Sequence, residues 1–192
     1  MEEFNYFELG WEHIISTDAL DHQLFILVLA ALYTVREWKQ VLILVTAFTI
    51  GHSVTLALST MDVITADREW VEFLIPCTIV ITAITNFLHK NFNPRRIQIN
   101  YFLALFFGLV HGLGFANTIR DTLARDQSIT WPLLQFNLGL EAGQIVLVVC
   151  ILLLAYVFIY LLRLNRRWWI FLLSGIGLVV ALKIAIERIQ EL

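Results

Sequence analysis

The sequence predicts an all-α fold, a polytopic membrane helical bundle with six transmembrane helices in a single domain spanning residues 1–192. The first observation is composition: 59% of the residues are hydrophobic, only 15% are charged, and the mean hydropathy is +0.76. Soluble domains carry about 25% charged residues. The second is that the apolar residues form long runs without period-2 alternation, which favours helices over a β-barrel. Together with a net charge of −3, these features exclude a soluble enzyme, a disordered chain and a nucleic-acid binder.

Six apolar runs are long enough, or nearly long enough, to cross a bilayer, which takes roughly 20 residues. The predicted spans are residues 20–36, 39–60, 70–90, 97–118, 131–162 and 168–187. The first is short, and the fifth is long enough to require tilting. Residues 1–19 alternate aromatic residues with acids and lack the basic start of a signal peptide, so we expect a segment lying at the membrane interface.

The loops predict the orientation of the bundle in the membrane. Cytoplasmic loops are enriched in lysine and arginine. One set of connections carries eight such residues and the other carries four. The first set therefore faces the cytoplasm, and both termini face outward, into the periplasm if the membrane is a bacterial inner membrane. Of the 16 acidic residues, 14 fall on the outer side, where they raise the local concentration of cations.

A few ionisable residues lie inside or at the outer ends of the predicted spans, where each costs about 2.5–3.5 kcal/mol on insertion and therefore suggests function. With this orientation they lie in the outer half of the bilayer, on four different spans. They are His13, Asp21, His22, His52, His111 and Glu141. Imidazole and carboxylate groups bind divalent transition metals, and they do not distinguish nickel, zinc, copper and cobalt. The spread in predicted depth leaves one ion or two open.

Polar neighbours of these residues are candidates for a supporting role around a metal. Asn137, Glu141 and Gln144 share one helical face, Ser53 follows His52, and Asp18 is an alternative to Asp21. Small residues flank the site as well, and we expect the glycines beside His111 and Glu141 to serve helix packing.

At these residues the chain resembles the HupE/UreJ family of hydrogenase and urease accessory membrane proteins, particularly its second branch. The matching segments are GWEHI with DHQLF (10–14 and 21–25), FTIGHSVTL (48–56), FGLVHGLGFA (107–116) and FNLGLEAGQ (136–144). The resemblance implies six or seven membrane helices, uptake of nickel or a similar divalent ion, maturation proteins of metalloenzymes as partners, and metal handling at the six residues above. The interval IISTDAL between His13 and Asp21 is longer than in relatives and lacks their glycine.

Two functions use the same predicted residues. The first is a divalent-metal permease that binds ions at the acidic outer face. The second is an intramembrane metalloenzyme, similar to the zinc-dependent amidases of membranes, in which the metal activates water and Ser53 and Glu141 are catalytic candidates. Metal sensing or storage is a third use of the same site. The chain contains no nucleotide-binding loop, which argues against ATP-driven transport. Metal identity, transport direction and oligomeric state stay open at this level.

Overall fold

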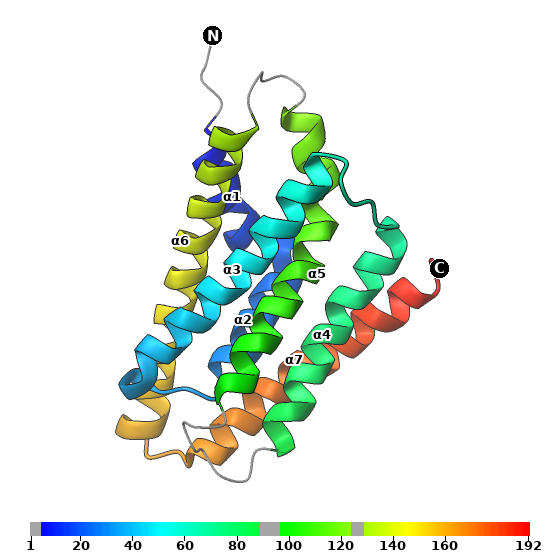
Figure 1. Ribbon diagram of the computed structural model, residues 1–192. Helices are drawn as coiled ribbons and strands as arrows, with labels where there is room; N and C mark the ends of the chain where they lie inside the picture. The colour runs from blue at the N-terminus through cyan, green and yellow to red at the C-terminus, as the bar shows by residue number, and fades with distance from the viewer. Residues whose placement is uncertain (1–4, 89–96, 124–128) are drawn as a thin grey trace.

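The computed structural model describes residues 5–88, 97–123 and 129–192, and all of its regular elements are helical (Figure 1). No strand occurs within these ranges, so the prediction of an all-α fold is confirmed. The helices are α1 (Tyr6–Ile15), α2 (Leu20–Ala30), α3 (Trp38–Thr60), α4 (Arg68–Leu88), α5 (Ile97–Leu123), α6 (Thr130–Ala155) and α7 (Arg166–Ile189). Short 3₁₀ turns at Thr17–Ala19 and Val35–Glu37 precede α2 and α3, and a π-helical turn at Tyr156–Leu161 extends α6.

Four helical segments in the described part of the chain are long and apolar enough to cross a membrane. They are Val35–Thr60, Arg68–Leu88, Thr130–Leu161 and Arg166–Ile189. The predicted count of six is not confirmed. With 11 residues, α2 is about 17 Å long, against the roughly 30 Å of a hydrocarbon core. In α5 the apolar part that can be assessed is Asn100–Phe115.

The first predicted span, 20–36, is wrong at its C-terminal end, because the helix stops at Ala30. The carboxylate of Glu37 accepts hydrogen bonds from the backbone N–H and the hydroxyl of Thr34, at 3.0 and 3.1 Å. The guanidinium of Arg166 donates to the carbonyl of Leu32 and to Glu37. Side chains thus satisfy the backbone groups that a longer helix would have used, and the chain turns into α3.

The closest helix packing joins α3 to α5. A Cβ added at Gly51 would collide with the backbone of α5, and one at Gly108 would collide with the carbonyl of Phe48. Only glycine allows the two backbones to approach this closely. The two helices run in the same direction, because Phe48 faces Gly108 and His52 faces Gly112 one turn further along.

The N-terminal helix α1 packs against the first half of α6 in a similar way. A Cβ at Gly139 would strike the carbonyl of Phe7, and one at Gly10 would strike the carbonyl of Phe136. The predicted packing role of the glycine next to Glu141 therefore agrees with the structure. The segment predicted to lie at the interface forms, from residue 6 onward, a helix that buries Tyr6 and Ile14 against its neighbours.

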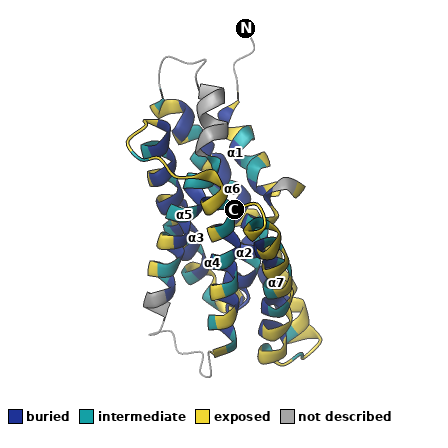
Figure 2. Cartoon of the chain, turned by 90° about the vertical axis from the view of Figure 1, so that its right-hand side faces the viewer, coloured by how far each residue is buried: buried dark blue, intermediate teal, exposed yellow. Residues whose placement is uncertain are grey.

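Helices α4 and α7 form an antiparallel pair beside this core, held by Phe87 against Phe171 near one end and by Glu72 with Arg188 near the other. Figure 2 shows the buried residues facing the interior of the bundle and many exposed residues along α7. Two apolar clusters fill the interior. One contains Phe48 and the other contains Phe136, and the histidines described next lie near both rings.

Candidate metal centre

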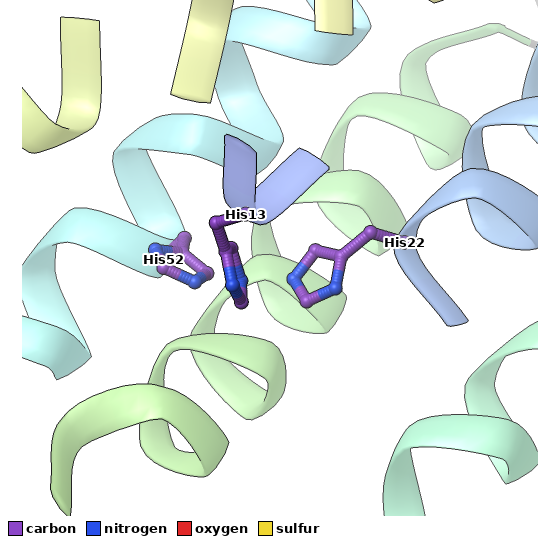
Figure 3. Close-up of side chains that lie close together, drawn as sticks. All are labelled: His13, His22 and His52. Atoms are coloured by element: carbon purple, nitrogen blue, oxygen red, sulfur yellow. The ribbon is translucent and has the colours of Figure 1, made fainter. Parts of the chain in front are cut away.

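Four histidines from four helices gather inside the bundle. His13 comes from α1, His22 from α2, His52 from α3 and His111 from α5. The first three each offer a ligand atom, and these atoms all lie within 4.8 Å of one another. Figure 3 shows their rings facing one another. The ring of His111 lies 4.9 Å from that of His22, measured between centroids. We call these four residues the histidine group.

A tight turn brings His13 and His22 together, although nine positions separate them. The 3₁₀ turn at Thr17–Ala19 joins α1 to α2. The side-chain amide of Gln23 fastens this turn by donating to the carbonyls of Ile14 (3.0 Å) and Ser16 (2.8 Å). The ring centroids of His13 and His22 are consequently 4.8 Å apart. The long interval IISTDAL is the sequence that builds this turn.

The contact between α3 and α5 positions the other two histidines. A Cβ at Gly112 would strike the carbonyl of His52, so the two backbones touch next to the site. His52 is completely buried, and His111 is 1% exposed. Phe48 lies between them, with its ring centroid 6.3 Å from that of His52 and 5.0 Å from that of His111.

In His22 and His111, a hydrogen bond determines which ring nitrogen keeps a free lone pair. Nδ1 of His22 lies 2.9 Å from the carboxylate Oδ1 of Asp21, and Nδ1 of His111 lies 2.8 Å from the carbonyl of Phe107. Both acceptors require a proton on Nδ1 of the neutral ring, which leaves the lone pair on Nε2. The same arrangement orients histidines that bind metals.

The Nε2 atoms of all four histidines are buried and lack a hydrogen-bond partner, and Nδ1 of His52 also lacks one. Leaving a buried polar group without a partner costs about 1–3 kcal/mol. Burial, reinforced by the neighbouring His22, lowers the pKa of His13 to about 3, so this imidazole is neutral at physiological pH. Neutral imidazoles with free nitrogens are the form that binds a metal.

Aromatic rings enclose the group. The ring of Phe115 lies 3.9 Å from His13, and the ring of Phe136 lies 5.8 Å from His13 and 6.4 Å from His52. An apolar enclosure excludes water and strengthens electrostatic interactions inside it. These phenylalanines cannot be recognised as site residues from the sequence, because a phenylalanine in an apolar helix usually belongs to the core.

Glu141 lies away from the histidine group. Its carboxylate Oε1 accepts a hydrogen bond from the Thr46 hydroxyl at 2.7 Å. Thr46 lies six residues before His52, about 9 Å along α3 at 1.5 Å per residue. One turn along each helix, the hydroxyl of Thr49 lies 2.8 Å from Oε1 of the fully buried Gln144. Thr46 was not predicted as a site residue, and its position becomes informative only through its contact with Glu141.

The other predicted supporting residues make local contacts. Ser53 donates to the carbonyl of Thr49 in its own helix at 2.7 Å. The Nδ2 of Asn137 donates to the carbonyl of Leu133, while its Oδ1 is buried without a partner. The side chain of Asp18 lies outside the described residues. Asp21 contacts the group through His22.

Comparison with known proteins decides the family. A family model described as HupE / UreJ protein matches residues 1–188 of the chain. The chain belongs to the HupE/UreJ family. Searches of curated proteins and of solved structures found no match to it.

As a HupE/UreJ protein, the chain is a helical membrane protein of a family linked to metal handling. Its histidine group fits that role chemically. Two nitrogens bound to one metal at about 2.1 Å in a tetrahedral site lie about 3.4 Å apart, and the ligand atoms of His13, His22 and His52 are already within 4.8 Å. These three residues could therefore hold a metal ion, with His111 next to them.

Proposed function

We propose that this HupE/UreJ protein is a permease for divalent transition-metal cations of the nickel type, and that the cation it carries binds at the histidine group. The observation that carries the proposal is the convergence of four buried imidazoles whose Nε2 atoms have no partner. Polar groups buried without partners are rare in proteins. A cation that binds them would remove the cost of leaving them unpaired.

The ligand set favours a borderline metal over a hard one. Imidazole nitrogens bind nickel, zinc, copper and cobalt, whereas magnesium and calcium prefer oxygen ligands. Asp21 contributes by holding Nδ1 of His22, which fixes the orientation of the ring and leaves Nε2 for the metal. In this proposal the metal ligands are His13, His22, His52 and His111, and Asp21 orients one of them. Nickel specificity is taken from the family.

Transport requires that the cation leave the group in the direction of the second membrane face. Two polar pairs in the contact between α3 and α6 support such a route, Thr49 with Gln144 and Thr46 with Glu141. They continue from His52 toward the start of α3, which the distribution of lysine and arginine assigns to the cytoplasm. Glu141 in this proposal belongs to the onward path and not to the metal ligands.

The metalloenzyme alternative has less support. It needs a catalytic acid and a nucleophile next to the metal. The hydroxyl of Ser53 is engaged by the Thr49 carbonyl, and the carboxylate of Glu141 is engaged by Thr46. The hydrogen bonds described for these two sequence-predicted candidates therefore go to threonines and not to a histidine.

Uptake into vesicles tests the proposal. Purified protein is reconstituted into liposomes that contain a metal-sensitive dye, and Ni²⁺, Co²⁺, Zn²⁺ or Mg²⁺ is added outside. We expect uptake of transition metals, no uptake of Mg²⁺, and loss of uptake in His52→Ala. The matched control is His89→Ala, which changes the fifth histidine, at the C-terminal end of the predicted span 70–90. Unchanged uptake in His52→Ala would contradict the proposal.

A further inference from the structure

A cavity of about 410 Å³ opens between α2, α4 and α7. Its walls carry four carboxylates and one guanidinium, which gives a formal charge of −3 when all are ionised. These groups belong to Asp21, Glu72, Glu187, Glu191 and Arg188. A concave surface with excess negative charge and low-dielectric walls concentrates cations.

One wall of the cavity reaches the histidine group. The side chain of Asp21 lines the cavity and is 29% exposed, whereas the side chain of His22, 2.9 Å away, is 5% exposed. Asp21 therefore has one side toward the cavity and the other on an imidazole of the proposed metal site. A single carboxylate thus lies between the cavity and the place where the cation is proposed to bind.

Pro76, in the wall of the cavity, takes one regular hydrogen bond away from the backbone of α4. Pro76 lies inside α4 and lines the cavity together with Glu72. Proline has no N–H, so the carbonyl four residues earlier, that of Glu72, lacks its regular helical donor. Glu72 therefore supplies both a carboxylate and a carbonyl that its helix leaves without a regular partner. This carbonyl is independent of the acidic side chains, and oxygen ligands of this kind coordinate cations.

The side chain of Arg188 places a fixed positive charge among the acidic residues of the cavity. Its Nη1 lies 2.9 Å from Glu72 and 2.8 Å from Glu191, and its side chain is 40% exposed. Arg68 approaches the other oxygen of Glu72 at 2.5 Å. A mobile cation that approaches Asp21 through the cavity must compete with Arg188 for Glu72, so the guanidinium weakens the hold of these acids on the cation.

We propose that this cavity is the vestibule through which a divalent cation reaches the histidine group, and that Arg188 sets the rate of passage by competing for Glu72. The inference rests on the proposed function. A transport path needs weak binding before the stronger site. Without Arg188, the acidic residues of the cavity would retain the ion.

Rapid mixing with Ni²⁺ tests the vestibule, using the full chain purified in detergent and separate measurement of association rate, dissociation rate and equilibrium Kd. We expect Glu72→Gln to lower, and Arg188→Gln to raise, the association rate by about threefold to tenfold, the lower end of the range for electrostatic steering. The dissociation rate should change in the same direction, so that the Kd of the histidine group stays constant. Higher salt should shrink the differences.

Matched controls carry the same charge changes outside the cavity. Glu69→Gln removes an acid one turn from Glu72, and Lys39→Gln removes a cation at the start of α3; neither residue lines the cavity. Both should bind at the wild-type rate. Ile184→Trp narrows the cavity and should slow association and dissociation together, whereas Ile186→Trp, at an exposed position on the same helix, should not.

The outcomes separate the two proposals. If the wild-type protein binds Ni²⁺ at equilibrium but Glu72→Gln, Arg188→Gln and Ile184→Trp all associate at the wild-type rate, the vestibule is wrong and the histidine site stands. A change in Kd without a change in association rate also overturns the vestibule. If the wild-type protein does not bind any of the transition metals, the permease proposal fails, and the vestibule fails with it.

Discussion

Oδ1 of Asp21 lies 2.9 Å from Nδ1 of His22 and also accepts the backbone N–H of His22 at 2.7 Å. These two contacts lock the carboxylate against the imidazole and leave Nε2 as the nitrogen with a free lone pair. The same carboxylate lines the cavity between α2, α4 and α7. One acidic side chain thus connects the cavity with the buried histidine group.

Replacing Asp21 with asparagine tests this link. Asp21→Asn removes the carboxylate that orients the ring of His22, so we expect the metal affinity of the purified protein to fall about 10–100-fold. Titration calorimetry with Ni²⁺ measures the change. Glu8→Gln removes an exposed acid of α1 that bonds to Asn5 and should keep the wild-type affinity. Equal affinities in the two variants would show that Asp21 does not act on the metal.

The unpaired nitrogens of His52 should lower the stability of the metal-free protein, although they serve metal binding. In the metal-free protein each buried group without a partner costs about 1–3 kcal/mol, so the apolar variant His52→Leu should unfold at the same temperature as the wild type or higher. The rise in Tm that Ni²⁺ produces in the wild type should disappear. Thermal unfolding in detergent, with and without Ni²⁺, measures both quantities. A variant that unfolds earlier yet keeps the metal-induced rise would place the metal elsewhere.

The backbone contact at Gly112 predicts a site that depends on helix spacing. Gly112→Ala places a methyl group against the carbonyl of His52 and the hydroxyl of Thr55. We expect a loss of about 1–3 kcal/mol of stability from overpacking, together with weaker Ni²⁺ binding because α3 and α5 separate. Gly175→Ala is the control, since nothing lies within 4 Å of its added Cβ. If both variants bind Ni²⁺ like the wild type, the close contact does not position the histidines.

The low pKa of His13 predicts how the metal-free protein responds to acid. Its folded pKa is about 3 and its unfolded value is 6.5. Below pH 6.5 the unfolded chain therefore takes up a proton that the folded chain does not, and stability falls as the pH drops, by up to about 1.4 kcal/mol per pH unit. Unfolding measured from pH 7 to pH 5 should show a smaller loss in His13→Gln than in the wild type. Parallel curves would mean that His13 titrates normally in the folded protein.

Glu141 separates binding from transport. Because its carboxylate bonds to Thr46 and not to a histidine, Glu141→Gln should keep the equilibrium affinity for Ni²⁺ while the rate of uptake into liposomes falls. Thr46→Val removes the partner and should act in the same direction. Leu138→Ala changes an exposed residue of the same helix and serves as the control. Loss of Ni²⁺ binding in Glu141→Gln would show that Glu141 is a metal ligand.

Composition and the position of polar residues in apolar runs were enough to predict an all-α bundle and to select all four histidines of the group. They were not enough to define the set of contacts. The apolar run 20–36 continues past the end of α2, because the hydrogen bonds that stop the helix come from Glu37 and from the distant Arg166. The contacts of Arg166 span 129 or more positions and leave no periodic signal in the sequence.

Depth in the bilayer, by which Glu141 was predicted beside the histidines, does not define contacts either. Rise per residue gives a position along one helix, but it does not give the rotation or offset of that helix against its neighbours. Glu141 turns to Thr46, whereas His13 and His22 meet through a turn fastened by Gln23.

The sequence by itself determined that this chain folds into apolar helices and that a few imidazoles and carboxylates must lie among them, because burial of apolar surface and the cost of buried charge are properties of single residues. The tertiary structure alone decided which of these groups meet. That decision depends on the turn before α2, on the glycine contacts between α3 and α5 and on the cavity beside Asp21. The glycine contacts and the cavity join residues far apart in the chain, so that no local pattern contains them.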